Sequence, residues 1–310
     1  MGRKDRKQSK RRNKRWWKIP LIIFGILILA SSALAFYLIS NVRSTVNNDL
    51  HTEIDSIDSA ITKKKLNNKD PLNILLLGVD ERENDRGRSD TMIVLTLDPD
   101  NEKMQMISIP RDTEAEIAGD GRVTRINHAY AYGGSNMSVD TVENFLDIEI
   151  DYFSRVNMEG LAQLVDAVDG ITVENNRSFQ YDGYQFPKGE LQLSGKESLA
   201  YVRMRKEDPE GDAGRNERQR QVIQGVLDKG TNLNMINQMD EVMDVLGNNV
   251  STNMNFDAVR KLGTNYSGAR KEVETYQMTG SSKTSSGMYL IEMSEEEIEK
   301  THDMIVNFGS

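Results

Sequence analysis

The sequence predicts an α/β domain with a layered α-β-α architecture, preceded by one transmembrane helix and a helical stem. Three observations predict this organisation. The chain opens with a basic segment followed by a long apolar run, and a polar segment with a helical apolar stripe comes next. From residue 71 onward, short apolar runs alternate with amphipathic helical patterns, which is typical of layered α/β domains.

The first 40 residues have the pattern of a membrane anchor. Residues 1–18 contain ten Lys or Arg against a single acid, and residues 19–40 form an apolar run. About 20 helical residues are needed to cross a bilayer. A cleaved signal peptide is the alternative, but its apolar core is usually shorter. By the positive-inside rule, we expect a single-pass protein of the cell membrane, with a cytoplasmic N-terminus and an extracellular C-terminal domain.

The part of the chain after the basic tail is acidic. The net charge is −9 overall and +9 for residues 1–18, which leaves −18 for residues 19–310. This acidity argues against nucleic acid as a partner. Anionic membrane lipid is sufficient to explain a basic tail beside a membrane span. The chain has no cysteine, so a thiol nucleophile and a disulfide framework are both excluded.

Residues 41–70 are predicted to form the extracellular helical stem. Apolar residues recur there at spacings of three and four, as on one face of a helix. They are Val42, Val46, Leu50, Ile54, Ile57 and Ile61. Because Pro71 disfavours helix at the preceding residue, we place the domain boundary near Asp70. The catalytic domain is then residues 71–310, with a motif-bearing core at residues 71–230.

Within this domain the apolar runs predict strands and the longer periodic segments predict helices. Short apolar runs bounded by turns indicate strands that are buried on both faces. The predicted strands are 74–77, 92–95, 106–109, 171–173 and 288–293. The predicted helices are 139–146, 158–168, 194–203, 216–229 and a closing helix from residue 295.

Two carboxylates lie beside neighbouring strand ends. Asp80 follows the first predicted strand, and Asp90 precedes the second. Open α/β sheets bind ligands at strand ends, and Mg²⁺ is commonly held by one or two carboxylates together with phosphate oxygens. Asp80 and Asp90 are therefore the predicted ligands of Mg²⁺ or Mn²⁺.

Arginines are concentrated in two later segments. Arg111 follows the third strand, and a guanidinium can hold a phosphate by two parallel hydrogen bonds. If residues 203–205 are extended, Arg203 and Arg205 share one face, while Arg215 and Gln219 share a helix face. Both pairs could then converge on one polyanion. The alternative is that the aspartates cap turns and the arginines form a solvated, ion-paired helix start.

The candidate residues form two overlapping sets. The expected phosphate-binding residues are Arg82, Arg88, Arg111, Arg203, Arg205, Arg215, Arg218 and Gln219. The expected catalytic residues are Arg111, Asp112, Arg203 and Arg205. Asp112, Asp208 and Asp212 could each act as the general base, and Asp112 is our choice among them.

Five ordered motifs resemble those of the LytR-CpsA-Psr family. They are GVDER at 78–82, GRSDT at 87–91, SIPRDT at 108–113, RINH at 125–128 and YVRMRKEDPEGDAGRNERQRQ at 201–221. The resemblance covers residues 71–230 and implies a central mixed sheet. It also implies metal binding by Asp80 and Asp90, and diphosphate binding by a set of five residues. This set is Arg111, Arg203, Arg205, Arg215 and Gln219.

The resemblance further implies an activity in a Gram-positive bacterium. Such an enzyme takes an anionic glycopolymer, most often wall teichoic acid, from an undecaprenyl diphosphate carrier. It attaches the polymer to peptidoglycan by a phosphodiester bond at the 6-hydroxyl of N-acetylmuramic acid. Two other functions remain open from the residues alone: a lipid-pyrophosphate hydrolase with water as acceptor, and a non-catalytic, membrane-anchored regulator of wall synthesis.

Overall fold

The structure is a computed structural model that describes residues 40, 42–81, 87–205, 208–229, 245–247, 249–285 and 287–309. The chain divides after Val42, and Arg43–Ser310 is one compact unit. The predicted anchor at residues 19–40 lies, except for its last residue, outside the described residues. Across the ranges that the structure describes, no helix combines the length and the apolar character that crossing a membrane requires.

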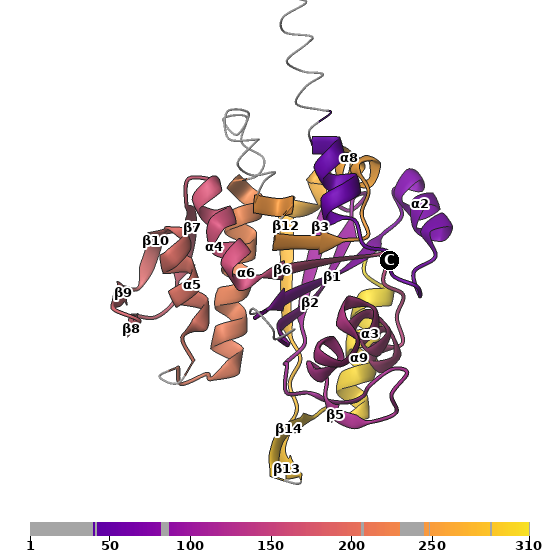
Figure 1. The fold of residues 1–310 in the computed structure, drawn as a ribbon. Helices are drawn as coiled ribbons and strands as arrows, with labels where there is room; N and C mark the ends of the chain where they lie inside the picture. The colour runs from indigo at the N-terminus through magenta and orange to yellow at the C-terminus, as the bar shows by residue number, and fades with distance from the viewer. Residues whose placement is uncertain are drawn as a thin grey trace, which may run out of the picture. The chain divides into compact units, whose positions relative to one another are not determined.

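A six-stranded mixed sheet forms the centre of the domain, in the order β11-β6-β1-β2-β3-β12 (Figure 1). Its strands are β1 (Leu72–Val79), β2 (Ser89–Asp98), β3 (Lys103–Ser108), β6 (Tyr152–Asn157), β11 (Val250–Thr252) and β12 (Glu272–Gln277). The pairs β1–β2, β2–β3 and β6–β11 are antiparallel, whereas β1–β6 and β3–β12 are parallel. The three strands predicted at the start of the domain are confirmed, and so is the mixed sheet.

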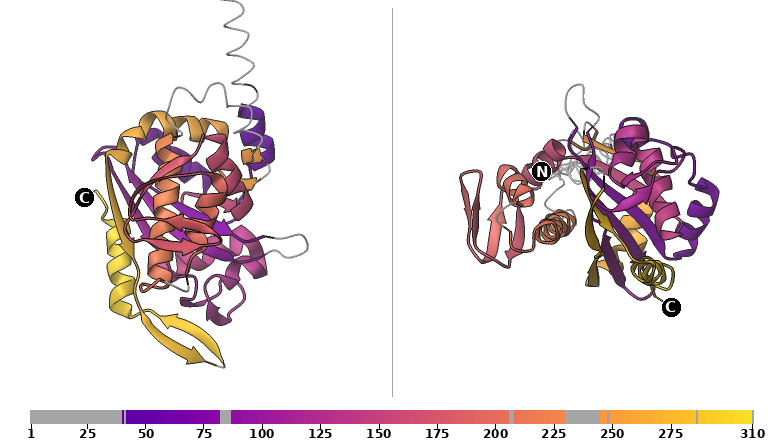
Figure 2. Two further views of the ribbon diagram at one scale, coloured as in Figure 1. Left: turned by 90° about the vertical axis from the view of Figure 1, so that its left-hand side faces the viewer. Right: turned by 90° about the horizontal axis from the view of Figure 1, so that it is seen from below.

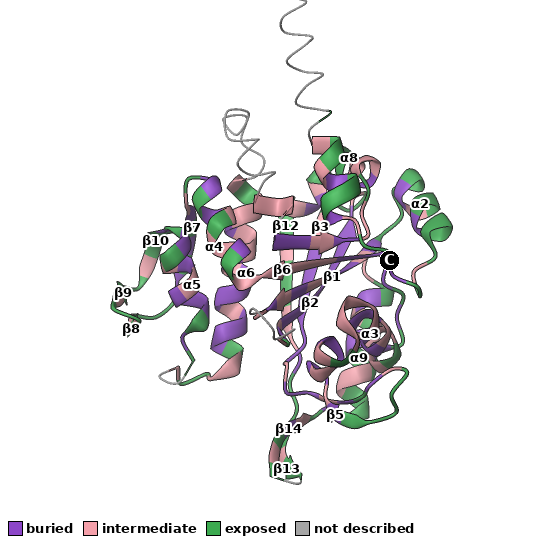
Figure 3. Ribbon diagram, viewed as in Figure 1, coloured by how far each residue is buried: buried purple, intermediate pink, exposed green. Residues whose placement is uncertain are grey.

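Helices cover both faces of this sheet, because β1 carries apolar side chains toward both. Leu75 and Leu77 belong to one core cluster, whereas Ile74 belongs to the other, as the period-two alternation of a strand requires. The first cluster is closed by α3 (His128–Leu146) and α9 (Glu295–Val306). The second is closed by α2 (Ser59–Asn68) and α8 (Phe256–Asn265). Figure 3 shows the resulting buried strands between more exposed helices.

A separate lobe with its own core carries the arginine-rich motif, and the right-hand view of Figure 2 shows it beside the sheet. Its elements are α4 (Met158–Ala167), β7 (Ile171–Asn175), β8 (Phe179–Tyr181), β9 (Tyr184–Phe186), β10 (Gly189–Leu193), α5 (Gly195–Arg203) and α6 (Asp212–Lys229). The predicted strand at 171–173 is confirmed as β7, but it pairs with β10 and not with the central sheet.

The start of α5 is defined by a capping box and a close helix contact. The Ser194 hydroxyl accepts a hydrogen bond from the Glu197 N–H at 3.4 Å, and the Glu197 carboxylate accepts one from the Ser194 N–H at 2.9 Å. A Cβ at Gly195 would lie 2.0 Å from the carbonyl oxygen of Ala162 in α4. The glycine therefore allows α5 to pack directly on α4, which places the end of α5 over the site.

The predicted stem does not form one continuous helix. A π-helical turn, η1 (Thr45–Leu50), is separated from α2 by the non-helical residues 51–58. Asp58 is the N-cap of α2. The Thr52 N–H donates to the carbonyl of Thr252 at the end of β11 at 2.8 Å. Val46, Leu50 and Ile54 are buried. The apolar stripe thus serves to pack this segment into the same compact unit as the domain.

Two small hairpins complete the fold near the ends of β1 to β3. The first joins β4 (Glu114–Glu116) to β5 (Val123–Arg125), and the second joins β13 (Ser281–Ser285) to β14 (Met288–Glu292). The second hairpin projects from the domain in Figure 1. It is attached at its base, where the Ile291 N–H donates to the Asp112 carbonyl at 2.9 Å.

Candidate active site

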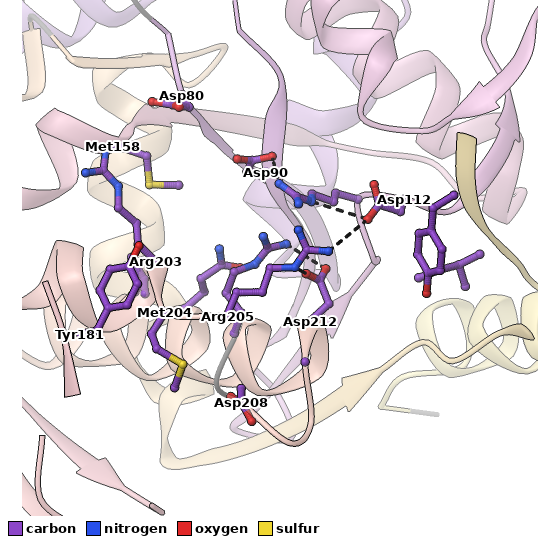
Figure 4. Close-up of a pocket in the computed structure, with 17 residues that line it drawn as sticks. Asp80, Asp90, Asp112, Met158, Tyr181, Arg203, Met204, Arg205, Asp208 and Asp212 are labelled. Carbon is purple, nitrogen blue, oxygen red and sulfur yellow. Dashed lines mark hydrogen bonds and ion pairs between the residues drawn. The ribbon is translucent and has the colours of Figure 1, made fainter. Parts of the chain in front are cut away.

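A cavity of about 930 Å³ lies between the strand ends of the central sheet and the lobe. Its charged and amide lining is Asp80, Asp90, Arg111, Asp112, Arg203, Arg205, Asp208, Asp212, Arg215 and Gln219. Figure 4 shows Asp80 and Asp90 on one side of the cavity and Arg205 pointing toward Asp112. Eight predicted site residues, widely separated in the sequence, therefore line one cavity.

Asp80 and Asp90 are brought together by the antiparallel pairing of β1 with β2. Val79 is paired with Ser89, with an irregularity in the register directly before this pair. A Cβ on Gly78 would lie 2.9 Å from the side chain of Thr91, so glycine permits the close approach of the strands here. Both carboxylates consequently face the cavity from adjacent strand ends.

Arg111 bridges the carboxylate of Asp90 in β2 and that of Asp112, which follows β3 in the chain. Its Nη1 lies 2.7 Å from Asp90 Oδ1, and its Nε lies 3.8 Å from Asp112 Oδ2. Burial by itself would lower the pKa of Arg111, but the charge of and the hydrogen bond to Asp90 outweigh it and raise the pKa. Arg111 Nε is buried without a hydrogen-bond partner among the described atoms. The guanidinium is thus charged, fixed and still able to donate to a ligand.

Asp112 is surrounded by three guanidinium groups. Its side chain is only 5 % exposed, with Arg125 Nε 3.2 Å from Oδ1 and Arg205 Nη2 3.9 Å from Oδ2, in addition to Arg111. This arrangement suits Asp112 to orienting the arginines around it. Its role as general base stays a prediction. Arg125 was not among the expected site residues, although it opens the RINH motif.

The start of α6 supplies Arg215 and Gln219, the second predicted pair of phosphate-binding residues. Asp212 links two arginines, with Oδ1 3.1 Å from Arg205 Nε and Oδ2 2.8 Å from Arg215 Nη2. Burial lowers the pKa of Arg215, as do the neighbouring charges of Arg111 and Arg205, although Asp212 acts in the opposite direction. Arg215 Nε and Gln219 Oε1 are buried without hydrogen-bond partners in the described structure. A buried N–H donor such as Arg215 Nε is expected where an anionic ligand completes the site, whereas Gln219 Oε1 is an acceptor and needs a hydrogen-bond donor or a cation.

Three of the predicted phosphate-binding arginines are not placed in the cavity lining. Arg82 lies outside the described residues. Arg88 is exposed and does not line the cavity, and its charge helps burial to lower the pKa of His128. Arg218 is buried beside the cavity and bonded to Asp208 at 2.6 Å. Arg220, another arginine of the cluster, donates to Ser108 Oγ at 2.7 Å and pairs with Glu217.

The cavity also has residues that the sequence did not single out. Tyr181 comes from β8, and Tyr289 and Ile291 come from β14. Tyr289 is 45 % exposed. The alternation along β14 would have placed Tyr289 and Ile291 on one face, but no pattern indicated that this face meets the strand ends.

The carboxylates of the cavity fit a divalent cation only together with a substrate. The described residues contain no group of three His, Cys, Asp or Glu side chains that could hold a metal ion. Asp80 and Asp90 supply hard oxygen ligands from neighbouring strands, and Mg²⁺ commonly takes the remainder of its six ligands from phosphate and water. The donor set therefore suits Mg²⁺ that binds with a phosphorylated ligand.

Comparison with known proteins relates this chain to one family. The LytR_cpsA_psr family model matches residues 36–306. The chain is 45 % identical over 290 residues to the polyisoprenyl-teichoic acid–peptidoglycan teichoic acid transferase TagU of Bacillus subtilis (strain 168), covering 94 % of both proteins. The crystal structure of B. subtilis TagU matches with a TM-score of 0.64 and 42 % identity, over 77 % of this chain and 96 % of that one. A structure of TagT bound to LI-WTA matches with a TM-score of 0.65 and 28 % identity, over 84 % and 96 %.

Proposed function

This chain belongs to the LytR-CpsA-Psr family, and on that premise we propose that it is a phosphotransferase that moves wall teichoic acid from an undecaprenyl diphosphate carrier to peptidoglycan. One observation carries the proposal. Four arginines and the two strand-end carboxylates Asp80 and Asp90 line a single cavity, in a chain whose relatives are named as teichoic acid transferases.

The donor diphosphate would bind to the arginines of the cavity. Arg111 and Arg215 carry buried N–H groups without acceptors in the described structure, so an anionic oxygen would satisfy both. Arg203 is exposed and forms no ion pair with any described residue, which leaves its guanidinium available to the same anion. Guanidinium groups bind phosphate in a fixed, two-pronged geometry, so the site would hold the diphosphate in one orientation.

The reaction exchanges the phosphoanhydride bond of the donor for a phosphate ester bond to the acceptor. The acceptor hydroxyl of the peptidoglycan sugar would attack the glycan-side phosphorus. The bond from this phosphorus to the bridging oxygen breaks, so that the lipid leaves as its monophosphate. Negative charge then develops on the leaving phosphate, where Arg205 and Arg215 would stabilise it. Mg²⁺ held by Asp80 and Asp90 would add charge neutralisation on the phosphate oxygens.

The hydroxyl proton must also be removed. Asp112, Asp208 and Asp212 all line the cavity, and all are ion-paired with arginines. Phosphoryl transfer depends mainly on positioning and electrostatic stabilisation, so a carboxylate that receives the proton late is sufficient. We retain Asp112 for this role, because it lies beside Arg111 in the turn that follows β3.

We also propose that the protein is a single-pass membrane protein with its catalytic domain outside the cell. Support comes from the basic residues 1–18 and the apolar run at residues 19–40. An anchor in the membrane would keep the enzyme in the leaflet that holds its lipid-linked donor. The acceptor, peptidoglycan, lies on the same side.

The test uses the full chain in lipid nanodiscs with an undecaprenyl-diphosphate-linked glycan, peptidoglycan oligomers and Mg²⁺. Arg111→Ala is the site variant, and Arg260→Ala, which changes an exposed arginine of α8, is the matched control. Mass spectrometry would detect glycan attached to the oligomer with the wild type and Arg260→Ala only. Release of free glycan phosphate would instead indicate a hydrolase, and donor binding without turnover would indicate a regulator.

A further inference from the structure

We infer that Arg218 is a positioning residue that fixes the arginines of the cavity, and that it does not itself bind the donor phosphates. This inference rests on the proposed function and concerns the same site. Within the arginine-rich motif, Arg203, Arg205 and Arg215 would then contact the substrate, whereas Arg218 would hold the surrounding backbone in position.

The contacts of the Arg218 guanidinium carry the inference. Nε donates to the carbonyl of Tyr201 at 2.9 Å, and Nη2 donates to the carbonyl of Met204 at 2.6 Å. Nη1 pairs with Asp208 Oδ2 at 2.6 Å. All three nitrogens are thus bonded to the protein, and the residue is 7 % exposed and does not line the cavity. Three of the five N–H groups are engaged by the protein, and burial away from the cavity lining keeps the others from a phosphate bound there.

These contacts lie around the two arginines that point into the cavity. α5 ends at Arg203, and the last carbonyls of a helix lack partners within the helix. Arg218 supplies a charged donor to two of them, including Met204, which stands between Arg203 and Arg205 in the chain. A shift of the Met204 backbone would therefore move both cavity arginines. A guanidinium with three directional contacts prevents that shift.

Asp208 and Gly214 secure the other end of the arrangement. The side chain of Asp208 is 5 % exposed and also accepts a hydrogen bond from the Glu210 N–H at 2.9 Å. A Cβ at Gly214 would lie 2.1 Å from Asp208 Oδ2. The first turn of α6 therefore needs glycine at this position for the carboxylate to reach Arg218.

An aromatic contact completes the surroundings of the guanidinium. Its central carbon lies 5.2 Å from the ring centre of Phe179 and 6.0 Å from that of Tyr201. Arginine over an aromatic ring in a buried site is held in one orientation, and lysine does not reproduce this geometry. Arg218→Lys would keep the positive charge but could not make the three directed contacts.

The experiment compares Arg218→Lys and Gly214→Ala in the full chain, with Arg260→Lys as the matched exposed control. Gly214→Ala alters no charge and no phosphate ligand, yet it displaces Asp208 from Arg218. We expect Arg218→Lys and Gly214→Ala each to lower turnover by roughly tenfold or more. Because Arg218 acts through Arg203 and Arg205, Arg218→Lys should lower turnover little further in a background that carries both Arg203→Ala and Arg205→Ala.

Farnesyl diphosphate binding, measured by calorimetry, gives a second readout that needs no acceptor. We expect both variants to weaken this binding to the same extent, while thermal unfolding shows that each remains folded. The inference is overturned if Gly214→Ala binds and turns over normally while Arg218→Lys fails. It is also overturned if the effect of Arg218→Lys multiplies with that of the Arg203→Ala, Arg205→Ala double variant. If the wild type binds the diphosphate but transfers nothing, the proposed function fails while the binding comparison still tests Arg218.

Discussion

Arg215 and Arg220 lie on the same helix and are both buried, but only Arg215 lines the cavity. We expect Arg215→Gln to reduce glycan transfer strongly with little loss of stability. Asp212, its partner at 2.8 Å, retains Arg205 at 3.1 Å after the substitution. Burial lowers the pKa of Arg215, so its charge is disfavoured in the folded state and its removal partly offsets the lost ion pair.

The loss of activity follows from the contact with phosphate. A hydrogen bond to a charged group contributes about 1.5–3 kcal/mol. Since about 1.4 kcal/mol corresponds to a tenfold change in rate, Arg215→Gln should lower the transfer rate by roughly tenfold to a hundredfold. Because Asp212 keeps its ion pair with Arg205, the free energy of unfolding should fall by only about 1 kcal/mol.

Arg220→Gln is the matched contrast. It removes the contact with Ser108 at 2.7 Å and the ion pair with Glu217, which keeps only the hydrogen bond from Gln221 Nε2 at 3.4 Å among the described residues. We expect the free energy of unfolding to fall by about 2 kcal/mol, with transfer by the folded protein within about threefold of the wild type. Urea unfolding and initial transfer rates would be measured for both variants. The reasoning would be refuted if the transfer rate of Arg215→Gln fell only in proportion to the fraction of the variant that is unfolded.

Three further substitutions probe the metal site, a buried ion pair and a helix cap. Asp90→Asn should raise the Mg²⁺ concentration for half-maximal transfer by roughly tenfold or more, and an unchanged Mg²⁺ titration would exclude Asp90 as a ligand. The side chain of Asp151 is 3 % exposed and lies 3.0 Å from Lys65, so Lys65→Met removes its counter-charge. The substitution should lower the free energy of unfolding, measured in urea at neutral pH, by about 3 kcal/mol. Burial raises the pKa of Asp151, so the folded state holds the carboxyl proton more tightly than the unfolded state does. The cost of Lys65→Met should therefore shrink as the pH falls toward about 4, where Asp151 becomes protonated. A cost that does not change with pH would contradict this. Ser194→Ala removes the cap of α5 and should lower the unfolding free energy by about 1 kcal/mol, whereas no change would mean that Glu197 alone sustains the cap.

The strand-end carboxylates could be predicted from the sequence because local pattern determines them. Apolar runs defined β1 and β2; Asp80 directly follows β1, and Asp90 is the second residue of β2. The same holds for Arg215 and Gln219, whose spacing of four places them on one helix face. Both features depend on neighbours within a few residues.

The roles of individual arginines could not be predicted in the same way. Arg215 and Arg218 are three residues apart on α6 and have the same chemistry. Their roles differ because Arg218 meets the carbonyl groups at the end of α5, a contact that depends on how the lobe packs. The predicted stem is helical only in part for a related reason. Val46, Leu50 and Ile54 are buried, and this packing interrupts the helix between Leu50 and Ser59.

One wall of the cavity is formed by Tyr289 and Ile291 of β14, which is the last strand of the chain. The residues that complete the site are therefore synthesised last. β12 pairs with β3 at the edge of the sheet, and Ile291 then attaches to Asp112 only a few residues before the closing helix α9. A nascent or shortened chain that ends near residue 230 would contain every predicted arginine and carboxylate, but neither this wall nor the edge strand. Synthesis itself thus delays the completion of the site, and fragments that carry all of the family motifs should be inactive.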